Sequence, residues 1–376
     1  MRILFIVNSV ASSVTARRRV VIHKALSADH DVTLAETSRR GHATRLAQSA
    51  ARESFDLVVV LGGDGTLNEA ANGLAGTETA LATLPGGSTN VFARILGLPD
   101  DSVDAVGVLL EALDAGNIKR IGLGSVEGRY FLFHCGIGFD AAVVEQVERR
   151  GPWKRWAGHP LFIYAAIDTW LRRVDRRTPP LRLVDGSGSV LTTGFFTVVM
   201  NADPYTFLGS RALELVPGLS LEDPLAAVTL EQLDLRTLGP VAGTALAHRP
   251  LDGCRNLDIR TDLRSLVIES DPPTPYQVDG DHLGASKRLR FAWTPAHLSL
   301  LVPLGGTDRS GSRCRPLVED SAGDIRNVGT NPIDPHVGEC ADAIGVVDRP
   351  HVDLQALRMC SLNERFSYQR VVRVDC

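Results

Sequence analysis

The stretch Leu61-Gly-Gly-Asp-Gly-Thr-Leu-Asn-Glu69 lies between two different hydrophobic patterns. The preceding Asp56-Leu-Val-Val-Val-Leu61 is a continuous apolar run, typical of a buried parallel strand. The following Ala70-Ala-Asn-Gly-Leu74 predicts the first turns of a helix. A strand, a glycine turn and a helix start bring together backbone N–H groups and a helix dipole, which bind phosphate. Asp64 inside this turn would repel phosphate unless it binds a metal or accepts a proton, so the stretch indicates phosphoryl transfer.

The same residues also fit a second interpretation. Thr66 as the N-cap and Glu69 at the third helical position form a capping box, which only requires a helix after a tight turn. For this turn taken alone, a capped helix and a phosphate loop are both open.

A second glycine loop, Leu84-Pro-Gly-Gly-Ser-Thr-Asn90, repeats the arrangement one strand later. Ser88 and Thr89 can donate hydrogen bonds to phosphate oxygens, while Gly86 and Gly87 allow a close backbone approach. One of the hydroxyls can instead act as a helix N-cap. Two such loops on consecutive strands predict a phosphate-binding crevice, although neither has the spacing of a Walker A or Rossmann motif.

The composition is that of an ordinary folded protein: 376 residues, 44% hydrophobic and 22% charged. The formal net charge of −4 argues against nucleic acid as a partner, because there is no basic excess to release counterions. The N-terminal run Met1-Arg-Ile-Leu-Phe-Ile-Val7 is too short for a signal peptide and is interpreted as a first buried strand. No run approaches the roughly 18 apolar residues of a membrane span. We expect a cytoplasmic protein that contacts a membrane peripherally.

Strands and helices alternate in the first part of the chain, which predicts an α/β domain with a parallel sheet. The expected strands cover residues 2–7, 31–35, 56–61 and 80–84, and the expected helices cover 16–28, 42–53, 66–74, 88–96 and 102–115. Asn8, Thr37, Asp64 and Gly86 each follow the end of a strand. Because ligands bind at the carboxyl ends of parallel strands, these residues are predicted to converge on one crevice.

The pattern changes near residue 118 to short β-rich runs, which predict an antiparallel sandwich or sheet. The expected strands cover residues 129–135, 192–200, 226–233, 265–269 and 288–293, interrupted by helical insertions at 138–149 and 161–173. The predicted organisation is an α/β domain (1–117), a β-rich domain (118–304) and a poorly ordered extension (305–376).

The two loops together resemble a known family. Gly62-Gly-Asp-Gly-Thr-Leu-Asn-Glu69 and Leu84-Pro-Gly-Gly-Ser-Thr-Asn-Val-Phe-Ala-Arg94 are similar to motifs of the catalytic domain shared by bacterial diacylglycerol kinases and eukaryotic sphingosine and ceramide kinases. The resemblance extends over residues 1–304. It implies a two-domain fold, also similar to NAD kinases, with a nucleotide-binding domain (1–117) and a lipid-substrate domain (118–304). ATP and Mg²⁺ would lie in the cleft, and a lipid hydroxyl, most simply that of diacylglycerol, would be the phosphoryl acceptor.

The resemblance also implies which residues bind the nucleotide. These are Asn8, Ser9, Ser12, Thr37, Gly62, Gly63, Asp64, Gly65, Thr66, Leu67, Asn68, Glu69, Gly87, Ser88 and Thr89. The first loop departs from the family's Asn-Pro-x-Ser-Gly, since Asn8-Ser-Val-Ala-Ser12 has neither the proline nor the glycine.

Two further matches concern acids. Val278-Asp-Gly-Asp281 aligns with the family's Asp-Gly-Glu, which makes Asp281 the proton acceptor, aided by Asp64; the alternative is a plain turn between strands. Ser220-Leu-Glu-Asp-Pro-Leu225 aligns with an Asp-Asp-Gly turn that holds a structural Mg²⁺. There Asp223, with Ser220 and Leu225, would be the ligand set, and a metal-free turn is the alternative.

The expected partners are ATP and a lipid at the membrane surface, and a homodimer is compatible with the sequence. Trp153-Lys-Arg-Trp156 and the helix at 161–173 mix aromatic and basic residues, which suits either a membrane interface or ordinary core packing. Two other functions stay open. One is a soluble-substrate kinase resembling NAD kinases, against which the Leu84-to-Arg94 motif argues. The other is a non-catalytic nucleotide- or lipid-binding regulatory module.

Overall fold

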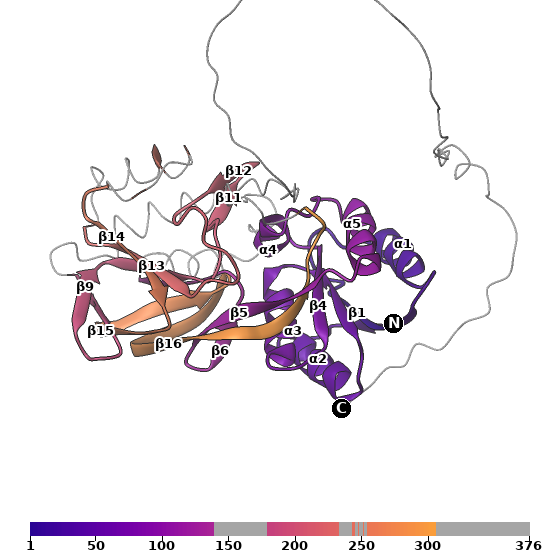
Figure 1. Ribbon diagram of the computed structural model, residues 1–376, viewed down its shortest axis with the longest axis horizontal. Coiled ribbons are helices and arrows are strands. Elements are labelled where there is room, and N and C mark those ends of the chain that lie inside the picture. The colour runs from indigo at the N-terminus through magenta and orange to yellow at the C-terminus, as the bar shows by residue number, and fades with distance from the viewer. Residues whose placement is uncertain (139–178, 233–242, 245–246, 248–250, 252–253, 306–376) are drawn as a thin grey trace, which may run out of the picture. The chain divides into compact units, whose positions relative to one another are not determined.

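The computed structural model of this chain describes residues 1–138, 179–232, 243–244, 247, 251 and 254–305 (Figure 1). These residues lie within one compact unit, Met1–Cys314. Apart from Gly138 and Gly305, four predicted regions fall outside the described residues: the helical insertions at 138–149 and 161–173, the tryptophan-rich segment at 153–156, and the extension at 305–376.

The α/β part of the chain (residues 1–117) is built on four parallel strands in the order β4-β3-β1-β2. The strands are β1 (Arg2–Val7), β2 (Asp31–Glu36), β3 (Leu57–Gly62) and β4 (Ala80–Pro85). The helices are α1 (Ala16–Leu26), α2 (His42–Arg52), α3 (Asp64–Leu74), α4 (Val91–Ile95) and α5 (Ser102–Asp114). Figure 1 shows α1 and α5 on one face of these strands and α2 and α3 on the other. Strands β3 and β4 are buried on both faces. A strand buried on both faces has a continuous apolar sequence, which is the pattern from which these strands were predicted.

The β-rich part (residues 118–305) is mainly antiparallel, as predicted. Its strands are β5 (Ile118–Val126), β6 (Arg129–Phe131), β7 (His134–Gly138), β8 (Leu181–Val184), β9 (Val190–Gly194), β10 (Phe196–Met200), β11 (Thr206–Leu208), β12 (Arg211–Leu213), β13 (Leu225–Leu230), β14 (Leu257–Leu263), β15 (Ser265–Val278) and β16 (Asp281–Leu301). A core that includes Phe131, Leu183, Val199 and Phe291 fills its interior. No helix in the ranges given above has the length and hydropathy to cross a membrane.

The long strand β16 joins the two parts of the chain. It pairs antiparallel with β15 and β5, and Leu300 then pairs in parallel with Leu81 of β4. The strands described here thus form one sheet of 14 strands, with β11 and β12 apart. The predicted boundary at residues 117 and 118 marks a change of pairing inside a continuous sheet, so a division into separate domains stays a prediction.

Strands β15 and β16 are longer than the predicted strands at 265–269 and 288–293. Pro272, Pro273 and Pro275 argued against a strand, because proline cannot donate to the ladder. The pairing of β15 with β16 shifts register between Glu269 and Thr274, and this irregularity accommodates two of the prolines while the hairpin continues to its turn.

That turn carries a buried carboxylate. Asp279 and Gly280 connect β15 to β16 with φ of 46° and 83°, the positive values of a tight two-residue hairpin. The Asp279 carboxylate accepts hydrogen bonds from the N–H groups of Leu132 at 2.8 Å and of Phe133 and His134 at 3.1 Å each. It also accepts one at 2.7 Å from the side-chain amide of Asn68 in α3. Asp279 therefore ties the hairpin, the β6–β7 connection and α3 together, while its burial raises its pKa to about 6.

We expect Asp279→Ala to lower the free energy of unfolding by at least about 3 kcal/mol, because four donors lose their acceptor and three of them are buried backbone N–H groups. Denaturant unfolding measures the loss. The matched control is Asp185→Ala, which removes a carboxylate whose partners lie within its own exposed turn, Ser187, Gly188 and Ser189, and should cost about 1 kcal/mol or less. Equal, small losses in both variants would contradict the role given to Asp279.

Candidate nucleotide and phosphoryl-transfer site

A cavity of about 310 Å³ opens at the carboxyl ends of β1, β2 and β3. Its wall combines the loops after β1 and β2, the first turns of α3 and one residue from the start of β16. The lining residues are Asn8, Val10, Thr37, Ser38, Arg39, Arg40, Gly65, Thr66, Glu69 and Asp281. The sequence placed six of these in one site: Asn8, Thr37, Gly65, Thr66, Glu69 and Asp281.

The N-terminus of α3 forms the floor of the cavity. Gly63 is the N-cap, so Gly65 and Thr66 are the second and third helical residues, and their N–H groups have no acceptor within the helix. Asn8 donates a hydrogen bond from its side-chain amide to the Thr66 hydroxyl at 2.8 Å, which joins the first loop to this helix. Unpaired N–H groups at the positive end of an 11-residue helix are suited to bind a phosphate.

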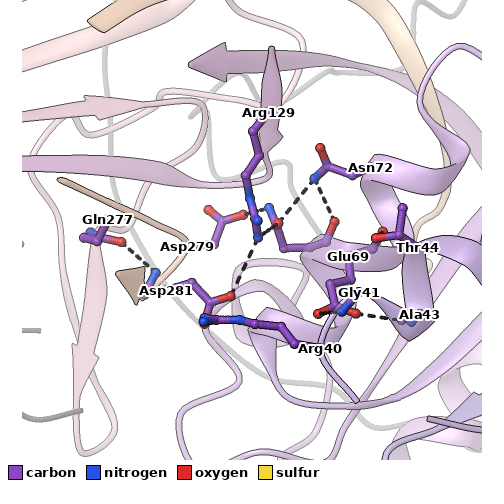
Figure 2. Close-up of polar contacts among 12 residues, drawn as sticks. Arg40, Gly41, Ala43, Thr44, Glu69, Asn72, Arg129, Gln277, Asp279 and Asp281 are labelled. Carbon is purple, nitrogen blue, oxygen red and sulfur yellow. Dashed lines mark hydrogen bonds and ion pairs between the residues drawn. The ribbon is translucent and has the colours of Figure 1, made fainter. Parts of the chain in front are cut away.

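Asp281 lies directly over this helix start. A Cβ atom added to Gly65 would lie 3.3 Å from Oδ1 and 3.4 Å from Oδ2 of Asp281, so a larger residue at position 65 would crowd the carboxylate. Figure 2 shows Arg40 and Arg129 meeting at Asp281. Their guanidinium nitrogens lie 3.2 Å and 3.7 Å from its two oxygens. The cavity thus brings a carboxylate, a helix N-terminus and two cations together.

Glu69 has a different role from the predicted capping box, which is wrong. Helix α3 begins at Asp64, two residues before Thr66, and Gly63 makes no side-chain cap. The Glu69 carboxylate instead accepts hydrogen bonds from the N–H groups of Gly41 at 2.7 Å and Ala43 at 3.2 Å, at the start of α2 (Figure 2). Glu69 therefore caps α2, whose N-cap Gly41 has a φ of 78° and no side chain to do so.

The loop between β2 and α2 is further held by His42. The Nδ1 atom of His42 lies 3.0 Å from the Ser38 N–H and accepts its hydrogen bond, which requires the neutral ring. Partial burial lowers the pKa of His42, and Arg45 and Arg39 lower it further, so the neutral ring is favoured. The loop that presents Ser38, Arg39 and Arg40 to the cavity is therefore fixed along its backbone.

The two glycine loops pack against each other. Gly86 donates its N–H to the Gly62 carbonyl at 2.9 Å. A Cβ atom at Gly86 would lie 2.7 Å from the Gly62 nitrogen, and one at Gly87 would lie 2.7 Å from the Gly63 Cα. These glycines were predicted to let the backbone approach phosphate. In the structure they let two neighbouring loops approach each other, which places Gly62, Gly63 and Gly87 behind the cavity wall.

Asp64 is committed to the second glycine loop and α4. Its Oδ2 accepts a hydrogen bond from the Val91 N–H at 3.0 Å, and its Oδ1 accepts one from the Phe92 N–H at 3.1 Å. Asn90, the N-cap of α4, makes no side-chain cap bond, so Asp64 supplies it from another helix. Burial raises the pKa of Asp64, while these N–H donors lower it. Asp64 does not line the cavity, and the catalytic role predicted for it remains a prediction.

The other predicted nucleotide residues fall into two groups. Leu67 is buried in the core, with its N–H bonded to the Gly63 carbonyl, and Asn68 is 1% exposed with its amide bound to Asp279. The remaining four, Ser9, Ser12, Ser88 and Thr89, are exposed on the first and second loops and do not line the cavity. Asn68 thus contributes to the junction between α3 and the β-rich part, and the four hydroxyls lie on the surface.

The predicted Mg²⁺ turn at Ser220–Asp223 closes on itself. Oδ2 of Asp223 accepts hydrogen bonds from the Ser220 N–H at 2.9 Å and hydroxyl at 2.7 Å. Leu225 is fully buried at the start of β13. Within the described ranges no three His, Cys, Asp or Glu side chains are grouped to hold a metal. The donor set here fits a hydrogen-bonded turn and does not fit a metal centre of its own.

Sequence reasoning missed five side chains at or beside the cavity: Val10, Ser38, Arg39, Arg40 and Arg129. The pair Arg39-Arg40 was an available signal, because it lies between the two positions already singled out, Thr37 and Gly41. Arg129 was not identifiable, since it reaches Asp281 from a strand 152 positions away in the chain.

The comparisons with known proteins agree with this architecture. The profile of the diacylglycerol kinase catalytic domain matches residues 2–126. A diacylglycerol kinase of Bacillus subtilis (strain 168) is 38% identical over 123 residues, which are 31% of this chain and 39% of the relative. A diacylglycerol kinase of Staphylococcus saprophyticus is 34% identical over 114 residues, which are 30% of this chain and 36% of the relative. The alignments thus span less than two fifths of these curated relatives.

Two crystal structures from Bacillus anthracis str. Sterne share the fold over more of the chain. One, provisionally named a diacylglycerol kinase, has a TM-score of 0.65 at 23% identity and covers 81% of this chain and 96% of its own. The other, named a diacylglycerol kinase, has a TM-score of 0.60 at 21% identity and covers 81% and 98%. The fold is therefore of the class found in these lipid kinase structures.

The sequence match is more specific than the fold. The α/β part of this chain matches the diacylglycerol kinase catalytic domain over residues 2–126, the stretch that holds both glycine loops. The resemblance drawn from the two glycine loops is confirmed.

We expect Gly86→Ala to lower the free energy of unfolding by about 1–3 kcal/mol, because the added methyl group would overlap the Gly62 backbone and Val14. Thermal and denaturant unfolding measure the change. Gly107→Ala in α5 is the control: a Cβ atom there meets nothing within 4 Å, and alanine in a helix should stabilise by up to about 1 kcal/mol. A Gly86 variant as stable as the wild type would show that the loops can separate at no cost.

We expect Asp64→Asn to destabilise the protein by about 1–3 kcal/mol and to speed hydrogen exchange in α4, because the amide replaces one acceptor with a donor facing two N–H groups. Asp101→Asn is the control, since asparagine is as good an N-cap as aspartate for α5. If Asp64→Asn keeps its stability and its α4 protection, the capping role is wrong.

Proposed function

We propose that this protein is an ATP- and Mg²⁺-dependent lipid kinase that transfers the γ-phosphoryl group to a lipid hydroxyl, most simply that of diacylglycerol to give phosphatidic acid. One observation carries the proposal: the Asp281 carboxylate lies over Gly65 at the N-terminus of α3, inside the cavity. A phosphate-binding helix N-terminus and a carboxylate that can accept a proton thus lie next to each other. The family match of residues 2–126 and the names of the relatives support the choice of a lipid acceptor.

In this proposal the chain's own residues bind and orient. The N–H groups of Gly65 and Thr66 hold the terminal phosphates, and Thr37 and Asn8 line the rest of the nucleotide site. The lipid hydroxyl oxygen forms a bond to the γ-phosphorus as the bond to the β–γ bridging oxygen breaks. The hydroxyl proton goes to Asp281, and ADP leaves.

Mg²⁺ fits this cavity only as an ion that arrives with the nucleotide. Of the two acids that line the cavity, Glu69 is bonded to the start of α2, and Asp281 is paired with two arginines. Magnesium is commonly held by phosphates and water with few protein carboxylates, and when bound it neutralises phosphate charge. A water-mediated contact of Asp64 to this ion remains part of the proposal, and its direct contribution is to hold α4.

The acceptor places the reaction at a membrane surface, so the proposal includes a cytoplasmic, peripherally associated protein; a homodimer stays a prediction. The experiment incubates the purified chain with γ-labelled ATP, Mg²⁺ and mixed micelles of diacylglycerol, ceramide or sphingosine, with NAD in a parallel reaction. Label in a lipid supports the proposal and names the acceptor. Label in NADP supports a soluble-substrate kinase, and nucleotide binding without transfer supports a regulatory module.

We expect Asp281→Asn to lower kcat by roughly 10²- to 10⁴-fold, because the amide cannot accept the hydroxyl proton. Its unfolding free energy should change by about 1 kcal/mol or less, since its ion pairs are partly exposed. Asp281→Glu, which restores the family's residue, should retain activity.

The matched control for Asp281 is Glu127→Gln. Glu127 also pairs with an arginine, Arg290 at 3.0 Å, but lies outside the cavity, so its variant should keep wild-type turnover. Wild-type kcat in Asp281→Asn would rule out Asp281 as the proton acceptor.

A further inference from the structure

The side chain of Arg40 is weakly held in the cavity. Its side chain is 65% exposed, and the one ion pair seen for it among the described residues joins it to Oδ1 of Asp281 at 3.2 Å. Exposed ion pairs of this kind contribute little, so the guanidinium group can change partner at low cost.

The backbone that carries Arg40 is fixed on both sides. Thr37 donates its N–H to the Val7 carbonyl at 2.9 Å, and Gly41 donates to Glu69 at 2.7 Å. The loop therefore presents Arg40 at the cavity in a defined place, and the freedom resides in the side chain. This is the arrangement expected of a residue that moves to meet a ligand.

Arg129, the second cation at Asp281, is held differently. Its side chain is 34% exposed and donates to Oδ1 of Asn68 at 2.9 Å, while lying 3.7 Å from Oδ2 of Asp281. Asn68 is in turn bound to Asp279 and to the Tyr130 carbonyl. Arg129 is thus anchored in the junction, and Asp281 keeps this cation if Arg40 leaves (Figure 2).

A phosphate at the start of α3 would compete for Arg40. Both the Asp281 carboxylate and the free N–H groups of α3 lie around Gly65. The Arg40 guanidinium group, which reaches the carboxylate, is therefore also close to a phosphate bound by these N–H groups. A terminal phosphate carries more charge than a carboxylate already shared with Arg129, and it can accept two parallel hydrogen bonds from one guanidinium group.

We propose that Arg40 binds the terminal phosphate of the nucleotide, and that it does so by leaving Oδ1 of Asp281, which is then free to accept the proton of the incoming hydroxyl. This inference rests on the proposed function and deepens it. It makes Arg40 the residue that distinguishes a triphosphate from a diphosphate, and it links nucleotide binding to the release of the proposed base.

The test measures the affinities of the full chain for ATP and ADP by calorimetry with Mg²⁺ present, in the wild type, Arg40→Ala and Arg40→Lys. We expect Arg40→Ala to weaken ATP binding at least about 10-fold and ADP binding less than about 3-fold, because only the triphosphate places a phosphate beside Arg40. Arg40→Lys should fall between, since it keeps the charge without the planar fork. In lipid kinase assays Arg40→Ala should raise the KM for ATP and lower kcat.

Arg52→Ala is the matched control, since Arg45, the other arginine of α2, affects His42 in the loop that presents Arg40. Arg52 is an exposed arginine at the end of α2 that does not line the cavity, so its variant should bind both nucleotides as the wild type does. Unchanged affinities in Arg40→Ala, or equal losses for ATP and ADP, would overturn the role of Arg40. A wild type that prefers ATP through Arg40 but labels no lipid would overturn the proposed lipid kinase function and leave the assignment of Arg40 in place.

Discussion

The buried carboxylate of Asp279 is the constraint on which the site depends. Its oxygens take three backbone N–H groups from the β6–β7 connection and the amide of Asn68 from α3. This fixes the hairpin turn against the helix whose N-terminus forms the floor of the cavity. Asp281 follows two residues later, at the start of β16, and the fixed turn places its carboxylate over Gly65. The proposed base is thus positioned by Asp279, two residues before it, through a junction in which Asp279 and Asn68 are buried.

The acidic residues around the two glycine loops have different roles: three stabilise the fold, and one is proposed to take part in the reaction. Asp64 caps α4, Glu69 caps α2 and Asp279 holds the turn. Each is a carboxylate whose charge faces backbone N–H groups, and Asp64 and Glu69 face the positive ends of helices. Asp281 differs, because its partners are two arginine side chains that can exchange for ligand groups.

The fold was predictable where local pattern and burial agree. Strand β1 was predicted with its observed bounds, and β2, β3 and β4 to within one residue at each end. For β1, β3 and β4 the reason is that buried parallel strands are continuous apolar runs bounded by turns, whereas β2 is a largely exposed strand at the end of the strand order. The lengths of β15 and β16 were less predictable. A register shift in their pairing accommodates prolines, which in a local pattern indicate the end of a strand. The role of Glu69 was wrong for a related reason: its partner, Gly41, lies 28 positions away, and spacing within the motif carries no information about it.

The position of Asp64 resolves a difficulty that its sequence raised. An acid in a phosphate loop should repel phosphate, and the sequence suggested a metal or a proton as the remedy. The structure supplies another: the carboxylate does not line the cavity and accepts hydrogen bonds from the N–H groups of Val91 and Phe92, so the N-terminus of α4 offsets part of its negative charge. The loop–loop contact of Gly62 with Gly86 makes this possible, because it brings α4 within reach of α3. Asp281 is then the carboxylate in the cavity that would still repel a phosphate. Arg129 offsets this repulsion, because its guanidinium group lies 3.7 Å from Oδ2 of Asp281 whatever Arg40 binds.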